Sequence, residues 1–343
     1  MKKENLCIVA GGSGGHILPA LVLAQQWKEQ NKNKKVLFFG NKKKLDQTIL
    51  QNNEFLDVAK FFKLINLPIK KIWFLPKFSF QFLNSFFKSF YFLHKFKIKK
   101  IIGTGGYLAI PVCFAGKILR CEIELYELNV EPGKTIKFLA PLAHKIFITF
   151  EKSKNYLPRI QNKCFLTDYP IRFNERDKIF NKAELIEKIN NKFFTQNKKT
   201  IFLLGGSKGS NFLNKTFEIW IENNKNFWHE IQIIHQTSFN ELQNIKDFYA
   251  EKNIPAIVFS FEKNIKDFYL LSDLVISRAG AGTIFELEFF QKKSVLIPLQ
   301  TKYTNHQVFN AKEIAARNVG RIIVLEQNQV KDSPNLLYLN IFN

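Results

Sequence analysis

LCIVAGGSGGHILPA, residues 6–20, indicates more about the architecture of the chain than any other stretch. Its first five residues are an apolar run that predicts a short buried strand. Residues 18–27 predict a helix with Pro19 in its first turn, where a missing N–H costs nothing. The glycine loop between them points backbone N–H groups and the positive end of the helix dipole at one place, which suits a phosphate or another anion. A tight turn that uses glycine for unusual backbone angles is the alternative, and this stretch alone leaves both open.

Two nucleotide-binding fingerprints fail when they are tested on the sequence. The dinucleotide pattern G-x-G-x-x-G, started at Gly12, requires a glycine where the chain has Ile17. The stretch PGKT at residues 132–135 has the ending of a phosphate-binding loop, but the glycine that should open that loop is Leu128. The sequence therefore argues against an ordinary dehydrogenase and an ordinary ATPase.

The unit of apolar strand, glycine loop and helix occurs four times. Besides residues 6–20, it occurs as KIIGTGGYLAIPV at 100–112, TIFLLGGSKGSNFLN at 200–214 and DLVISRAGAGTIFEL at 273–287. This alternation predicts the α/β class with doubly wound parallel sheets, in which ligands lie at the carboxyl ends of the strands. We expect two similar domains facing each other across a cleft, residues 1–165 and 166–343, with the crossing around 163–177.

The length and composition set broad limits on the kind of protein. No run of eighteen apolar residues occurs, so no transmembrane helix is expected, and the first apolar run is too short for a signal peptide. Four cysteines without paired ligand spacing indicate a reduced, cytoplasmic protein without zinc. The net charge of +22 points to nucleic acid, an anionic membrane surface or phosphorylated substrates. Lys, Asn, Ile and Phe are all abundant, as AT-rich coding favours. Part of the positive charge can therefore reflect codon composition instead of function.

Residues 61–100 differ from the rest because they hold nine lysines, thirteen aromatic residues and no acidic residue. Their later half predicts an amphipathic helix with Phe82, Phe86, Phe90 and Leu93 on one stripe. Such a segment suits the interface of an anionic membrane, or a protein core with lysines on its solvated side. Single-stranded nucleic acid, whose bases stack on aromatic rings, is a third interpretation.

The four glycine stretches, together with PLQTKYTNHQVFNA at 298–311, resemble the MurG family of bacterial glycosyltransferases from about residue 5 to about residue 325. The resemblance implies the GT-B fold, with two Rossmann-like domains, the first for the acceptor and the second for the donor. It implies transfer of N-acetylglucosamine from UDP-N-acetylglucosamine to lipid I, undecaprenyl-pyrophosphoryl-MurNAc-pentapeptide, which gives lipid II through a β-1,4 linkage formed with inversion.

The resemblance also implies how such an enzyme is placed and what it needs. No cofactor, metal ion or nucleic-acid partner is expected, and UDP-N-acetylglucosamine is a substrate. The enzyme is expected to be a peripheral protein on the cytoplasmic face of the cell membrane. The basic aromatic region 61–100 would provide the contact with the anionic membrane surface.

Two glycine loops of the first domain match family motifs. Ser13, Gly14 and Gly15 match the loop that approaches the donor pyrophosphate or sugar closely, because glycine has no Cβ. His16 matches the histidine proposed as general base on the acceptor 4-hydroxyl, a task that suits an imidazole titrating near neutrality. Support of the loop is the alternative role for His16. The second loop, implied to serve the acceptor pyrophosphate, consists of Gly103, Thr104, Gly105, Gly106 and Tyr107.

The remaining donor-binding positions carry polar side chains or begin a helix. Arg172 would stabilise the leaving UDP, and the helix that begins near Ala281 would aim its N-terminus at the α-phosphate. Glu286 would accept bonds from the ribose hydroxyls. The full set that the resemblance implies is Asn129 (in an E-x-N motif with Glu127), Arg172, Ser207, Glu262, Ala281, Gly282, Thr283, Glu286, Gln307 and Asn310.

The chain departs from the family pattern at several positions. Asp168 and Tyr169 replace Gly-Asn, and Ser238 replaces the glycine of H-Q-T-G. Glu262, expected to contact uracil through its backbone, stands where an apolar residue is common. Residues 292–294 read Lys-Lys-Ser instead of Gly-Lys-Pro, and fewer residues than usual follow Val324, which puts the coupling of the domains in doubt.

Two other functions stay open at this stage. A GT-B transferase for a different lipid acceptor would share the sugar-nucleotide half, although the two loops of the first domain argue against it. A decayed relative or a basic interaction module would use the charge without catalysis. The near-intact set of polar site residues argues against decay, and salt-sensitive binding of nucleic acid would favour it.

Overall fold

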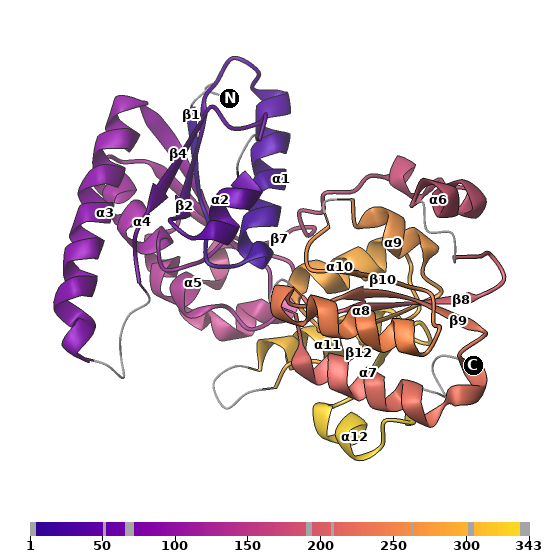
Figure 1. Ribbon diagram of the computed structural model, residues 1–343. Coiled ribbons are helices and arrows are strands. Elements are labelled where there is room, and N and C mark those ends of the chain that lie inside the picture. The colour runs from indigo at the N-terminus through magenta and orange to yellow at the C-terminus, as the bar shows by residue number, and fades with distance from the viewer. Residues whose placement is uncertain are drawn as a thin grey trace. The chain divides into compact units, whose positions relative to one another are not determined.

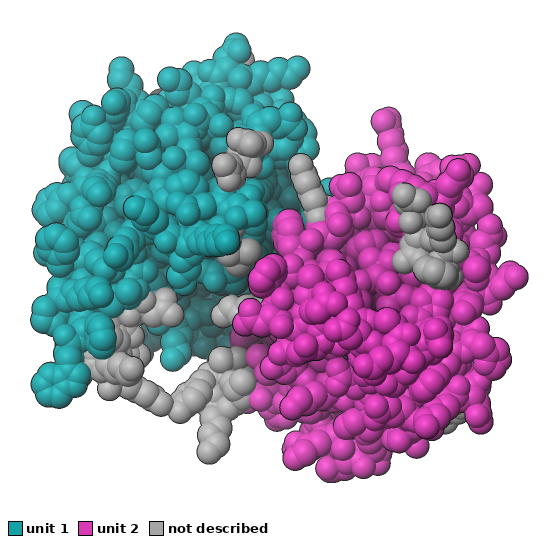
Figure 2. Space-filling view, viewed as in Figure 1, with its two compact units in different colours: residues 1–172 teal, residues 173–343 magenta. Residues whose placement is uncertain are grey.

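The computed structural model describes residues 5–50, 53–65, 72–189, 194–206, 209–262, 264–300 and 305–336. The chain divides into two compact units, residues 1–172 and 173–343 (Figure 2). The domain boundary expected between residues 165 and 166 falls inside β7 (Cys164–Leu166), which pairs with β6 (Lys145–Ile148). Residues 164–166 therefore belong to the sheet of unit 1 and are not part of the crossing segment.

The described strands of unit 1, several of them labelled in Figure 1, form a parallel sheet in the order β3-β2-β1-β4-β5-β6-β7. Besides β6 and β7 they are β1 (Asn5–Val9), β2 (Val36–Asn41), β3 (Val58–Phe62), β4 (Ile98–Gly103) and β5 (Glu122–Glu127). The α-helices of this unit are α1 (Gly14–Gln30), α2 (Lys44–Leu50), α3 (Leu75–Lys95), α4 (Ala109–Ile118) and α5 (Lys134–Leu139).

The described strands of unit 2 form a second parallel sheet, in the order β10-β9-β8-β11-β12-β13. They are β8 (Lys199–Leu204), β9 (Ile231–Gln236), β10 (Ala256–Phe259), β11 (Leu274–Ser277), β12 (Ser294–Leu296) and β13 (Ile322–Val324). The α-helices are α6 (Lys182–Lys188), α7 (Asn211–Asn223), α8 (Leu242–Glu251), α9 (Lys266–Leu271), α10 (Ala281–Phe289), α11 (His306–Arg317) and α12 (Gln327–Asp332).

The alternation of side chains along β1 explains why an apolar run forms a central strand. Cys7 and Val9 lie in a core cluster to which α3, α4 and α5 contribute, whereas Leu6 and Ile8 lie in a second cluster with α1 and α2. All four side chains are fully buried. A central strand of a parallel sheet is covered on both faces, so it needs apolar residues at successive positions.

Both sheets reverse their strand order at one place, between β1 and β4 in unit 1 and between β8 and β11 in unit 2. The chain adds strands outward on one side of this switch point and then returns to add strands on the other side. The predicted α/β class, with two Rossmann-like, doubly wound parallel sheets, is confirmed. The four glycine stretches found in the sequence follow the four strands that flank the two switch points.

The expected helix start at Leu18 is wrong, because α1 begins at Gly14. Ser13 is extended, with φ −157° and ψ 155°, and occupies the N-cap position. Gly14, Gly15 and His16 therefore form the first turn of a helix instead of a loop. Pro19 lies inside the helix and is buried, and its missing N–H removes one helical bond.

The predicted stripe of α3 faces the core of unit 1. Phe82, Phe86 and Phe90 are half-buried against the core cluster, and Leu93 is buried. The core interpretation is therefore the right one for this stripe. No helix in the described ranges is both long and apolar enough to cross a bilayer.

A second stripe of the same helix lies in solvent. Phe80 is 73% exposed and Phe87 is 64% exposed, and Leu83 and Tyr91 lie on the same side. Trp73, in the short 3-10 turn before the helix, is 85% exposed. Large apolar side chains in such a row mark an interaction surface when they are contiguous, so we define Trp73, Phe80, Leu83, Phe87 and Tyr91 as the outer α3 stripe.

Gly106→Ala is expected to lower the free energy of unfolding by about 2–4 kcal/mol, because the residue has a positive φ and its Cβ would strike backbone. Gly15→Ala is the matched control: a Cβ there meets only Ser13 Oγ, at 3.9 Å, so stability should stay or rise. Urea unfolding of both variants measures the difference. Equal stabilities would contradict the packing described for Gly106.

Candidate functional site

The two glycine loops of unit 1 pack directly against each other. Gly106 has φ +88°, and a Cβ on it would lie 2.6 Å from Gly11 O. Gly105 has φ +121°, and a Cβ on it would lie 2.8 Å from Nδ1 of His16. Thr104 is buried and donates from Oγ1 to the carbonyl of His16 at 2.8 Å. Glycine at 105 and 106 therefore lets the second loop reach the start of α1 and the imidazole.

The ends of the second loop lie in different surroundings. Gly103 is the last residue of β4, and a Cβ on it would lie 3.2 Å from a methyl group of Leu125. Tyr107 is half-buried against the core cluster of unit 1. The structure thus brings Gly103, Thr104, Gly105 and Gly106 together with the start of α1, while the Tyr107 side chain mainly packs on the core.

A buried carboxylate holds the first glycine loop in place. Asp46, on α2, accepts from the backbone N–H of Gly12 at 3.3 Å and from that of Asn41 at 3.0 Å, both at Oδ2. The Asp46 side chain is fully buried. The Gly12 N–H is therefore used within the protein. The sequence carried no spacing signal that would have identified Asp46.

Glu127, at the end of β5, organises the loop that carries Asn129. Its Oε1 accepts from the backbone N–H and the side-chain amide of Asn129, at 2.9 and 3.0 Å. Its Oε2 accepts from Gly133 N–H at 2.8 Å. Burial raises the pKa of Glu127, and the bonds from Asn129 and Gly133 oppose that rise. Because a carboxylate only accepts, it orients the Asn129 amide with its nitrogen toward Glu127.

Gly205 and Gly209, in the first glycine loop of unit 2, are packed as closely as Gly105 and Gly106 in unit 1. A Cβ on Gly205 would lie 2.8 Å from Ser210 N, and a Cβ on Gly209 would overlap Ser238 N. Gly206 donates its N–H to Oε1 of Gln236, at the end of β9, at 3.0 Å. Gln236 is a supporting residue that the sequence did not single out. Ser207 lies outside the described residues.

Arg278, directly after β11, ties the two loops of this switch point together. It donates from Nε to Ser210 Oγ at 3.2 Å and from a terminal nitrogen to Ile297 O at 3.0 Å. Ser210 in turn caps α7 by accepting from Leu213 N–H. Burial lowers the pKa of Arg278 to about 10. These contacts with the protein itself assign Arg278 a supporting role.

The start of α10 presents backbone amides at the switch point of unit 2. Gly280 is the N-cap, and the first helical bond runs from Ile284 N to Gly280 O at 3.1 Å. The amides of Ala281, Gly282 and Thr283 come before that bond, and the first turn holds no acidic residue. All three residues are half-buried. A helix start of this kind binds anions such as a diphosphate.

Three predicted polar residues lie on the helices next to this start. Glu286, one turn along α10, accepts at Oε2 from the hydroxyl of Tyr269 at 2.8 Å. Gln307 accepts from Leu299 N–H at 2.9 Å. Asn310 is fully buried, with Nδ2 3.5 Å from Ala279 O, so the structure favours support of the loop over direct contact with a sugar.

Two predicted residues lie outside the loops at the switch points, one in each unit. Glu262 follows β10 and accepts at Oε1 from Asn264 N–H at 2.7 Å. Arg172 is half-buried and is the last residue of unit 1, in the segment after β7. In the described part of the chain, no group of three or more His, Cys, Asp and Glu side chains is arranged to hold a metal ion.

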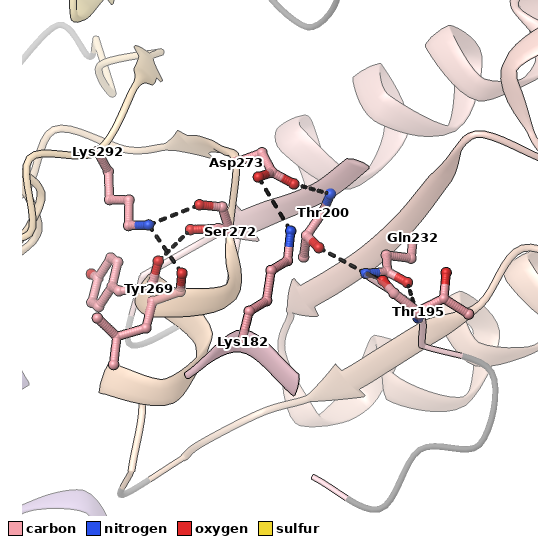
Figure 3. Close-up of polar contacts among 9 residues, drawn as sticks. Lys182, Thr195, Thr200, Gln232, Tyr269, Ser272, Asp273 and Lys292 are labelled. Atoms are coloured by element: carbon pink, nitrogen blue, oxygen red, sulfur yellow. Dashed lines mark hydrogen bonds and ion pairs between the residues drawn. The ribbon is translucent and has the colours of Figure 1, made fainter. Parts of the chain in front are cut away.

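A polar network at the opposite, amino edge of the second sheet holds α9 in place (Figure 3). Lys292 donates to the carbonyls of Leu270 and Ser272, at 3.2 and 2.9 Å, and Ser272 Oγ donates to Tyr269 O at 2.8 Å. Asp273 accepts from Thr200 N–H at 2.7 Å and lies 3.6 Å from the Lys182 ammonium. Burial lowers the pKa of Lys292 to about 8.

Two doubly wound units with glycine loops at their switch points define the GT-B class of protein. The chain belongs to glycosyltransferase family 28: the N-terminal domain of that family matches residues 6–148 and its C-terminal domain matches residues 200–336. The family that the sequence resemblance suggested is thereby confirmed.

Curated relatives match nearly the whole chain. A UDP-N-acetylglucosamine–N-acetylmuramyl-(pentapeptide) pyrophosphoryl-undecaprenol N-acetylglucosamine transferase from Rickettsia massiliae is 34% identical, over 95% of this chain and 88% of its own length. The transferase of the same name from Finegoldia magna is 30% identical, over 93% of this chain and 85% of its own length.

Solved structures share the fold. The crystal structure of Acinetobacter baumannii MurG matches with a TM-score of 0.70 and 21% identity, covering 99% of this chain and 91% of that chain. A UDP-GlcNAc 2-epimerase from Neisseria meningitidis, bound to UDP-GlcNAc, matches with a TM-score of 0.62 and 15% identity, covering 97% and 91%. At these identities the likeness establishes the architecture alone.

The pKa of Lys292 predicts a pH dependence of stability. Its folded pKa, about 8, is below the ordinary value of 10.5, so between these values the unfolded chain binds the proton and the folded chain does not. Stability should therefore rise with pH in this window. We expect the advantage of wild type over Lys292→Met to grow by about 1–2 kcal/mol between pH 7.5 and 9.5 in urea unfolding. A constant or shrinking advantage would contradict the burial of the ammonium group.

Proposed function

We propose that this protein transfers N-acetylglucosamine from UDP-N-acetylglucosamine to the 4-hydroxyl of MurNAc in lipid I, giving lipid II for peptidoglycan synthesis. The observation that carries the proposal is the 34% identity with the Rickettsia massiliae transferase over 95% of the chain. The glycine loops at both switch points support it, because open α/β sheets bind ligands at such positions.

Unit 2 would bind the donor. The diphosphate would lie at the start of α10, with Ser207 of the other loop on a diphosphate oxygen, and Glu286 would accept from the ribose hydroxyls. The uracil would contact the backbone at Glu262. Gln307 would contact the sugar, with Asn310 holding the loop before α10. The N-terminal end of the α10 dipole would stabilise the negative charge that develops on departing UDP.

Unit 1 would carry further contacts of the donor and of the acceptor. Asn129, oriented by Glu127, would contact the donor sugar, and Arg172 would pair with the diphosphate. Ser13, Gly14 and Gly15 would lie close to the donor, since the first turn of α1 carries no bulky side chain before His16. The loop from Gly103 to Tyr107 would serve the acceptor pyrophosphate.

The reaction would be a single displacement with inversion. His16 would take the proton of the acceptor 4-hydroxyl while that oxygen bonds to C1 of the sugar and the bond from C1 to the UDP oxygen breaks. The imidazole lies so close to Gly105 that a Cβ there would be 2.8 Å from Nδ1, and this confined position supports the proposal. No step requires a metal ion or a cofactor.

Product formation from UDP-N-acetylglucosamine and a lipid I analogue, in detergent with EDTA, tests this function. Wild type should release UDP and form a β-1,4-linked disaccharide, and His16→Ala should lower kcat by about a hundredfold or more. A loss below about tenfold would reduce His16 to loop support. UDP-sugar binding without product would point to a different acceptor, and absence of binding would point to a non-enzymatic relative.

We further propose that the outer α3 stripe contacts an anionic membrane from the cytoplasmic side, as a peripheral attachment. Its exposed aromatic rings suit the interfacial region of a bilayer, and lysines lie beside them. Lys77 lies 5.9 Å from the ring centre of Phe74, and Lys95 lies 5.6 Å from that of Tyr91. Lysines at a membrane surface add attraction to anionic lipids.

Binding to vesicles with and without anionic lipid tests the membrane contact. The double variant Phe80→Ser and Phe87→Ser should weaken binding by about tenfold or more, because two rings no longer enter the interface. Phe239→Ser, which removes a ring that is 79% exposed in unit 2, is the matched control and should bind like wild type. Equal losses in both variants, or binding that ignores anionic lipid and salt, would contradict the assignment.

A further inference from the structure

Tyr269 is a buried tyrosine whose hydroxyl donates a hydrogen bond to a carboxylate. Its side chain is fully buried, and its hydroxyl donates to Glu286 Oε2 at 2.8 Å. Glu286 is half-buried on α10, one turn after the helix start that would bind the donor diphosphate. A hydrogen bond to a charged acceptor is stronger than one between neutral groups.

The ring of Tyr269 is held by aromatic neighbours. It packs edge-on against Phe202 of β8, with ring centres 5.5 Å apart, and stacks on Phe290 at 5.4 Å. Phe202 belongs to the strand that leads into the first glycine loop of unit 2. The ring therefore has a fixed position between the central strand and α10.

The backbone of Tyr269 is held as well. Ser272 Oγ donates to its carbonyl, and Lys292 donates to the carbonyls of the next turn, as Figure 3 shows. Lys292 itself follows α10 and donates its backbone N–H to Leu287 O at 3.0 Å. The end of α9 and the end of α10 are thus joined, which fixes the distance between the Tyr269 hydroxyl and the Glu286 carboxylate.

We propose that Tyr269 is a positioning residue that orients the Glu286 carboxylate for the nucleoside of the donor, and so contributes to the selection of a ribose over a 2′-deoxyribose. The proposal rests on the proposed function for the identity of the donor. A carboxylate has two oxygens with several acceptor sites, so one carboxylate can accept from Tyr269 at Oε2 and from vicinal hydroxyls. Fixing the rotamer in advance removes the entropy cost of ordering a Glu side chain on binding.

Calorimetric binding of UDP and of 2′-deoxy-UDP to the full chain tests the inference without needing the acceptor. Wild type should prefer UDP by about tenfold or more, since a site built to accept a hydroxyl loses that bond with the deoxy ligand. Tyr269→Phe keeps the ring and removes only the donor. It should weaken UDP binding by about tenfold and bring the preference for UDP close to unity.

Tyr249→Phe is the matched control. Tyr249 is another buried tyrosine of unit 2, and its hydroxyl lies 2.9 Å from Nδ1 of His235, in the core. The Tyr249→Phe variant should lose stability like Tyr269→Phe while keeping the preference for UDP.

In a Glu286→Gln background, Tyr269→Phe should have little further effect on UDP binding, because both changes remove the same interaction.

Each outcome decides something different. An unchanged preference in Tyr269→Phe, or an equal loss in Tyr249→Phe, overturns the positioning role. A wild type that binds neither nucleotide overturns it together with the donor half of the proposed function. A wild type that binds UDP with the predicted preference but forms no disaccharide leaves the positioning role supported and rejects only the acceptor.

Discussion

The point at which each sheet reverses its strand order is the constraint on which the rest of the structure depends. In a parallel sheet every strand ends at the same edge, and at the switch point the two neighbouring connections leave toward opposite faces. Backbone amides at helix starts are thereby left at that edge. The glycine loops after β1, β4, β8 and β11 all lie at this edge of their own sheet, and these loops carry many of the predicted site residues.

Close approach, more than flexibility, explains the glycines. Gly105 lies against the imidazole of His16, and Gly106 lies against the backbone of Gly11, so each needs the absence of a Cβ. Carboxylates and amides behind the loops then fix them: Asp46 holds the first loop of unit 1, and Gln236 holds that of unit 2. The backbone is therefore arranged before a ligand arrives. Preorganised amides stabilise the charge on a leaving diphosphate more effectively than amides that must first be ordered.

The general architecture was predictable, because an apolar run followed by glycines and a helix has few structural solutions. The start of α1 was misplaced, since Pro19 marked a helix start by its usual preference, whereas Ser13 and two glycines already begin the helix. The predicted stripe of α3, with Phe82, Phe86 and Phe90, faces the core, and another stripe, with Phe80 and Phe87, faces solvent. Apolar residues at helical spacing occur on more than one side of this helix, so periodicity does not say which of these stripes packs on the core.

The supporting residues were the least predictable part of the site. Tyr269, Gln236 and Asp46 contact Glu286, Gly206 and Gly12, which are distant in sequence. None of the three stands in a spacing that signals chemistry. Glu127 was found only because it neighbours Asn129 in a short motif. Asn310 showed the reverse case: its spacing from Gln307 matches a sugar-reading face, yet the structure buries its amide beneath the loop before α10.

A crystal structure of the chain with UDP-N-acetylglucosamine tests the central claim most directly. We expect the diphosphate at the backbone amides of residues 281–283, the ribose hydroxyls on Glu286, and the Tyr269 hydroxyl still bonded to that carboxylate. A donor bound away from the switch point of unit 2, or a ribose that does not contact Glu286, would contradict it.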